Sequence, residues 1–64
     1  MNIETIEITY KNEDTVLFTG IIDAKTVENF YSIYFGDKEN RFQQYINLDE
    51  IKSIWIKYKK ENLI

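Results

Sequence analysis

Hydrophobic and polar residues alternate with a period of two at the start of the chain. Ile6, Ile8 and Tyr10 fall on one side of an extended backbone, and threonine and glutamate residues fall on the other. This alternation over 4–10 is typical of a half-buried β-strand. The sequence therefore predicts that the chain opens with a strand that contributes one face to a core.

A second strand is predicted directly after the first. The polar residues of 11–14 can turn the chain, and 15–22 is rich in β-branched and aromatic residues. Together these runs predict an antiparallel hairpin. Gly20 lies inside the second run, where a glycine indicates a bulge or a sharp bend of the sheet.

The middle of the chain supports two interpretations. Asp23 could cap a helix over 23–35, because apolar residues there recur at helical spacing. The run Phe30–Phe35 has instead the aromatic and β-branched composition of a strand. We favour a turn at 23–26 and a strand at 27–35. A turn at 36–40 and a strand at 41–46 would then form a second hairpin.

The closing segment from Tyr45 to Tyr58 is the most informative part of the chain. It reads as the end of one strand, a tight Asn-Leu-Asp-Glu turn and a final strand rich in isoleucine and aromatic residues. A helix over 48–60 also fits the spacing, but the composition of 54–58 favours a strand. We expect 48–50 to form one 3₁₀-like turn and 59–64 to be a loose tail.

These elements predict a single all-β domain over residues 1–64. The expected plan is a five-stranded antiparallel meander, closed as a strongly bent sheet or an SH3-like small barrel. An α+β fold with a helix at 23–35 or 48–60 is the alternative. A chain of 64 residues buries only about 60% of its unfolded surface, and the absence of cysteine excludes disulfides. We therefore expect a homo-oligomer, which would bury further apolar surface.

The composition argues against an enzyme. Histidine and cysteine are both absent, so the chain lacks the side chains that most often serve as bases, nucleophiles and zinc ligands. The only serines, Ser32 and Ser53, lie inside predicted strands, and the only glycines, Gly20 and Gly36, are too far apart for a phosphate-binding loop. We predict no catalytic residue, no metal and no cofactor.

The charge distribution bears on location and partners. Residues 1–50 hold ten acids and four bases, whereas 51–64 hold four lysines and one glutamate, for a net charge of −3 overall. An acidic chain is not expected to bind the phosphate backbone of nucleic acid, because such binding needs a concentrated basic surface. The sequence shows no signal peptide and no apolar run of the roughly 20 residues that span a membrane. We expect a cytoplasmic protein without a membrane partner.

The number of aromatic residues exceeds what so small a core can enclose. On the strand at 30–35, either the set Phe30/Ser32/Tyr34 or the set Tyr31/Ile33/Phe35 must point outward. Exposed aromatic residues mark contact surfaces. The sequence therefore predicts a protein-binding module for a partner of unknown identity. Its candidate contact residues are Tyr31, Tyr34, Phe35, Tyr45 and Trp55.

Two alternatives involve nucleic acid. A single-stranded nucleic acid could stack on Trp55 and follow the lysines Lys57, Lys59 and Lys60. In a strand, Trp55, Lys57 and Lys59 would share one face, and Ile54, Ile56 and Tyr58 would line the core side. The excess of acids over residues 1–50 would instead suit an acidic mimic of nucleic acid.

The chain resembles the short β-rich accessory proteins of phages and mobile elements of low-GC Gram-positive bacteria. The residues that carry this resemblance are Ile6–Asp14, as an opening hairpin, and Tyr45–Ile54, as a closing turn and strand. The resemblance implies a protein that binds a host or phage protein and modulates it, for instance as an inhibitor of a host enzyme or defence system.

Overall fold

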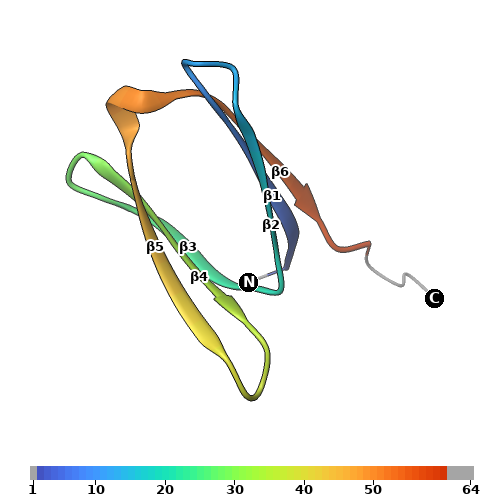
Figure 1. Cartoon of the computed structure of the whole chain (residues 1–64). Helices are drawn as coiled ribbons and strands as arrows, with labels where there is room; N and C mark the ends of the chain where they lie inside the picture. Colours follow the sequence, from blue (N-terminus) through green and yellow to red (C-terminus); the bar gives the residue numbers. More distant parts are fainter. Residues whose placement is uncertain (1, 61–64) are drawn as a thin grey trace.

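The computed structural model describes residues 2–60, and its regular elements there are strands and one 3₁₀ turn (Figure 1). The all-β prediction is confirmed, and neither 23–35 nor 48–60 forms a helix. No helix in the described part of the chain could cross a membrane. The elements are β1 (Ile3–Tyr10), β2 (Thr15–Thr19), β3 (Ile21–Val27), β4 (Phe30–Gly36), β5 (Arg41–Asn47), the 3₁₀ turn η1 (Leu48–Glu50) and β6 (Ile51–Tyr58).

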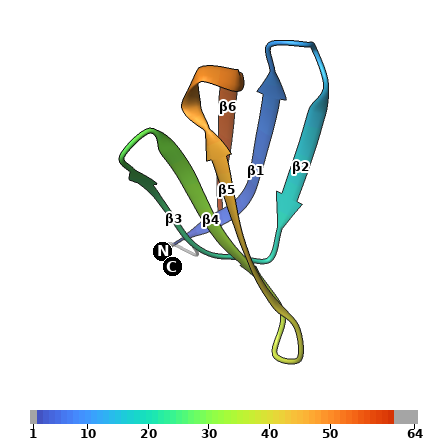
Figure 2. The same cartoon turned by 60° about the vertical axis from the view of Figure 1, so that its left-hand side comes forward.

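The strands form two antiparallel three-stranded sheets. Sheet A has the order β2-β1-β6, and sheet B has the order β3-β4-β5. The sheets face each other and are connected at one end by the β2–β3 junction and at the other by η1 (Figures 1 and 2). The predicted five-stranded meander and SH3-like barrel are not confirmed, because the structure has six strands in two sheets that are not closed into a barrel.

Gly20 is the reason that the predicted strand at 15–22 becomes two strands. Its φ of +64° lies in the left-handed region, which L residues with a side chain rarely adopt. Its carbonyl accepts a hydrogen bond of 2.9 Å from the Gly36 N–H. A Cβ at position 20 would lie 2.8 Å from the Gly36 carbonyl oxygen. The bend expected at Gly20 is therefore present, and it carries the chain from sheet A into sheet B.

The predicted turn at 23–26 is wrong. These residues belong to β3, where Ala24 pairs with Ile33 and Thr26 pairs with Tyr31. The chain turns instead at Glu28 and Asn29, with Glu28 at a φ of 54°. Pairing with β4 outweighs the local turn preference of the polar residues in β3, since tertiary context routinely overrides intrinsic preference.

The core lies between the facing surfaces of the two sheets. Ile6 and Ile8 of β1 and Ile33 of β4 are fully buried. The Phe18 ring of sheet A packs edge-to-face against the Phe35 ring of sheet B, with ring centroids 5.3 Å apart. Contacts of this kind add about 0.5–1.5 kcal/mol beyond the area they bury. The other buried apolar residues are Ile3, Ile21, Tyr31 and Ile46.

The closing segment folds as predicted up to its last residues. The Asn47 side-chain oxygen accepts a hydrogen bond of 2.9 Å from the Asp49 N–H, which caps η1. Strand β6 then pairs with β1, placing Ile54 opposite Ile8. Of the predicted loose tail at 59–64, Lys59 and Lys60 follow β6 without regular structure, and the Lys59 N–H donates to the Asn2 carbonyl at 2.7 Å. The rest of that tail, 61–64, lies outside the described residues.

We expect Gly20→Ala to destabilise the fold. A left-handed conformation costs a residue with a Cβ about 1–2 kcal/mol, and the clash with Gly36 adds to this cost. Urea unfolding followed by tryptophan fluorescence measures the change in the free energy of unfolding. Thr19→Ala, at the adjacent exposed position, is the control. Equal unfolding midpoints for Gly20→Ala and the wild type would contradict this role of Gly20.

Candidate protein-binding surfaces

The structure does not bring the five predicted contact residues together. Tyr31 is only 9% exposed, and Phe35 packs against the core, so both point inward. The outward set on β4 is therefore Phe30/Ser32/Tyr34. Tyr34 and Tyr45 lie on the outer face of sheet B, whereas Trp55 lies on the outer face of sheet A. The five candidates are therefore divided among the core, the outer face of sheet B and the outer face of sheet A.

The outer face of sheet A carries Trp55, the most exposed large hydrophobic side chain of the described residues. In one row across the sheet, Glu7 of β1 pairs with Leu17 of β2 on one side and with Trp55 of β6 on the other. Trp55 is 70% exposed and Leu17 is 56% exposed. We call Leu17, Glu7 and Trp55 the Trp55 patch. It presents two large apolar side chains around one carboxylate, from three different strands.

The outer face of sheet B is more polar. The Tyr45 ring, 53% exposed, packs edge-to-face against Phe30 at a centroid distance of 6.4 Å. Ser32 pairs directly with Tyr45 and is only 2% exposed, and its hydroxyl accepts a hydrogen bond of 3.1 Å from the Gln43 side-chain amide. A shallow hollow of about 360 Å³ opens here. Its lining residues are Asp23, Lys25, Ser32, Tyr34 and Gln43.

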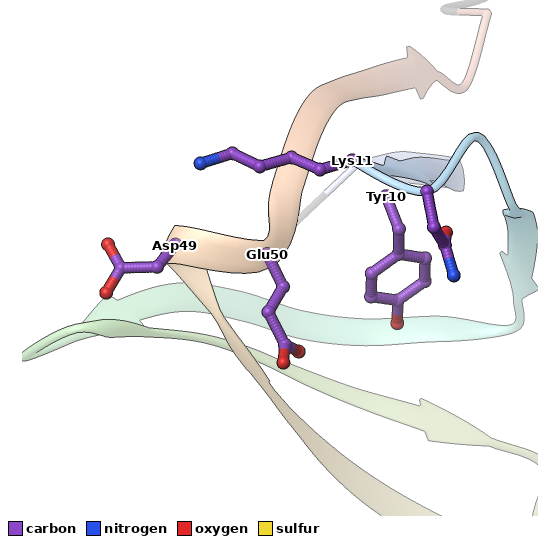
Figure 3. Close-up of a pocket in the computed structure, with 5 residues that line it drawn as sticks. Tyr10, Lys11, Asp49 and Glu50 are labelled. Carbon is purple, nitrogen blue, oxygen red and sulfur yellow. The ribbon is translucent and has the colours of Figure 1, made fainter.

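A second hollow, of about 340 Å³, lies where the β1–β2 turn meets η1 (Figure 3). The Lys11 N–H donates to the Glu50 carbonyl at 2.9 Å and holds the two turns together. Figure 3 shows the Glu50 carboxylate and the Tyr10 hydroxyl on the same side, with Lys11 extending away from them. Asn12 and Asp49 complete the lining. The mixture of charges gives this hollow no strong preference for an anion or a cation.

No three metal-ligating side chains gather within residues 2–60. One of the three lysines proposed for nucleic-acid binding, Lys57, lies close to a carboxylate, as does Lys52 elsewhere on β6. The Lys57 ammonium is 3.4 Å from a Glu4 carboxylate oxygen, and the Lys52 ammonium is 2.7 Å from Glu13. Trp55 and Lys57 do share the outer face, as expected, but Glu7 and Glu4 share it with them. These carboxylates would repel phosphate groups.

The inner side of β6 is less enclosed than predicted. Ile54 packs against the core, as expected for the core side of this strand. Tyr58 is 64% exposed, although it alternates onto the same side. The physical reason is that the sheets do not close around the far end of β6. Tyr58 therefore remains available to solvent.

Sequence reasoning missed the exposed apolar residues Leu17 and Phe42, and it left Phe30 in one of two alternative outward sets. Leu17 could have been found from the alternation of β2, because a strand that buries Phe18 turns its sequence neighbour outward. Phe42 has no such signal. Its ring stacks on Phe35 at 5.6 Å on the inner side, and it stays exposed only because sheet A does not cover it.

Comparison with known proteins adds no family to this description. No protein-family model matches the chain, and no match is found among curated proteins or solved structures.

Tyr31 makes stability sensitive to alkaline pH. Burial raises the pKa of its hydroxyl, and the nearby Tyr58 raises this pKa further. The folded chain thus holds this proton more tightly than the unfolded chain. The resulting stabilisation is complete below the unfolded pKa of about 10 and is lost as the pH rises through the folded pKa. We expect Tyr31→Phe to lose less stability than the wild type above about pH 10.

Urea unfolding at a series of alkaline pH values measures this difference. Because the Tyr31 ring is buried, the readout is the slope of stability against pH and not its absolute value. Tyr45→Phe, on an exposed ring of the outer face of sheet B, is the control. A Tyr31→Phe variant with the same alkaline slope as the wild type would contradict the prediction.

Proposed function

We propose that the chain is a non-enzymatic protein-binding module whose contact surface is the Trp55 patch. The observation that carries this proposal is the 70% exposure of Trp55, on the same face of a three-stranded sheet as the exposed Leu17. Tryptophan is among the residues that contribute most at protein interfaces, where truncating such an anchor costs about 2 kcal/mol or more. The rigid sheet behind the ring limits the entropy lost on binding.

Physical chemistry supports a protein partner over a small ligand. Small-molecule sites are concave, and neither of the two hollows described above is lined by a residue of the Trp55 patch. Both of these hollows are shallow. Glu7 between the two apolar side chains can select a partner that offers a basic or hydrogen-bond-donating group at that point.

We further propose that the protein is a phage or mobile-element accessory protein that modulates a host or phage protein in the cytoplasm, and that it self-associates. The resemblance of residues 6–14 and 45–54 supports the first point. Exposed apolar side chains on both sheets support the second.

We propose also that the fold is an opened form of the SH3-like barrel. If β2 and β3 are counted as one strand bent at Gly20, the strands number five. Their order becomes β6-β1-β2/β3-β4-β5, with β5 and β6 as the two outer strands. The Gly36 N–H bond to the Gly20 carbonyl supports counting them as one strand, because it fixes the corner between them.

The test is affinity purification from the native host with tagged wild type and with Trp55→Ala. We expect a partner to co-purify with the wild type, and we expect the substitution to weaken the complex by about thirtyfold, the equivalent of 2 kcal/mol. Tyr45→Ala removes an aromatic ring of lower exposure from the outer face of sheet B and is the matched control.

Retention of the partner by Trp55→Ala together with its loss from Tyr45→Ala would move the contact surface to sheet B. If nothing co-purifies and the native mass is that of a monomer, the proposal fails.

A further inference from the structure

Strand β6 has an open edge. Within the described residues it pairs with β1 alone, because sheet A ends at β6 on that side. At about 3.3 Å per residue, its eight residues span about 26 Å. An edge strand presents a row of unpaired N–H and C=O groups, to which another extended chain can pair. The edges at β2, β3 and β5 are shorter.

The charge of this edge distinguishes it from the others. From Ile51 to Lys60 the chain has four lysines and no acid. Strand β3 contains both an aspartate and a lysine, and β2 contains no charge. Strand β5 contains one arginine, but acidic turns lie at both of its ends. An incoming strand at β6 therefore gains from carrying carboxylates.

Both faces of the β6 edge also offer contacts. Trp55 and Lys57 lie on the outer face. Ile56 and Tyr58 lie on the inner face, where Ile56 is partly exposed and Tyr58 is largely exposed. An added strand would place one set of its side chains beside Trp55 and Lys57. Its other set would lie beside Ile56 and Tyr58, where it would cover apolar surface.

A second copy of the chain is a poor occupant of this edge. Antiparallel pairing of β6 with β6 of another copy would bring the two lysines of each strand, Lys52 and Lys57, together with those of the other, and like charges across strands are destabilising. Nucleic acid is also a poor occupant, because it has no peptide backbone to pair with the N–H and C=O groups of the edge. The Lys57–Glu4 and Lys52–Glu13 ion pairs are exposed and weak, so a peptide carboxylate can replace Glu4 or Glu13 at little cost.

We propose that the edge of β6, over Ser53–Tyr58, binds an extended acidic peptide segment of another protein as an added strand. The bound segment alternates, with carboxylates beside Lys57 and apolar side chains beside Ile56 and Tyr58. This proposal deepens the proposed function and depends on it, since it assigns a chemistry to the partner and places the partner's backbone next to Trp55.

The experiment uses two capped peptides of the same length as β6. In one, valine alternates with glutamate; in the other, valine alternates with lysine. Each is titrated into the ¹⁵N-labelled chain, and amide hydrogen exchange is measured with and without peptide. We expect the glutamate peptide to bind at least about tenfold more tightly than the lysine peptide. We also expect it to slow exchange of β6 amides that exchange rapidly in the free chain.

The charge-reversal variant Lys57→Glu/Lys59→Glu provides the matched test. Both side chains are exposed, so the fold should be retained, as checked by urea unfolding. We expect the variant to prefer the lysine peptide. Equal binding of both peptides by the wild type, or binding without protection of β6 amides, would overturn the strand-addition proposal.

Two further outcomes separate this inference from the proposed function. Trp55-dependent capture of a host protein, with no β6 protection by that protein or by either peptide, would reject strand addition and leave the Trp55 patch as the contact surface. Binding of a thymidine oligonucleotide of about ten nucleotides in place of the glutamate peptide would overturn both and assign the lysines to nucleic acid.

Discussion

The corner at Gly20 is the constraint on which the rest of the structure depends. It ends β2 and begins β3, so that one continuous run of β-forming residues contributes an edge strand to each of two sheets. The positive φ and the close approach of the Gly36 carbonyl both require a residue without a side chain. Because Phe18 ends up opposite Phe35 after this bend leads the chain into sheet B, the contact between the two rings depends on it as well.

The small size of the chain explains the distribution of its apolar residues. Two three-stranded sheets can enclose a single layer of isoleucine and aromatic side chains, with Ile6, Ile8 and Ile33 at its centre. Phe42 stays exposed because the sheets are not closed, and Trp55 and Leu17 stay exposed because they lie on the outer face of sheet A. A chain of this length has little surplus stability. Apolar surface that stays exposed under that constraint is available for a partner.

The open edge and the exposed face of β6 are two consequences of the same topology. Strand β6 returns from η1 to pair with β1, the first strand of the chain, and this leaves its other side unpaired within the described residues. The bulge between Thr9 and Tyr10 of β1 and the cap at Asn47 set where this pairing begins. Trp55 therefore lies on a strand that is hydrogen-bonded to β1 along one edge and, within the described residues, is unpaired along the other.

The sequence by itself determined the strand-rich class, the hairpin of β1 and β2, the bend at Gly20 and the turn at Leu48–Glu50. Each of these follows from local alternation, glycine or capping chemistry. Trp55 was likewise identifiable, because alternation with Ile54 and Ile56 turns it away from the core side.

Tertiary structure alone decided the division into two sheets, the inward orientation of Tyr31 and Phe35, and the extension of β3 through the expected turn at 23–26. Both faces of the run Phe30–Phe35 are apolar enough to be buried, so the alternation of residues does not predict which face packs against the core. The choice came from the long-range contacts of Ile33 and Phe35 with the opposite sheet, which no local pattern encodes.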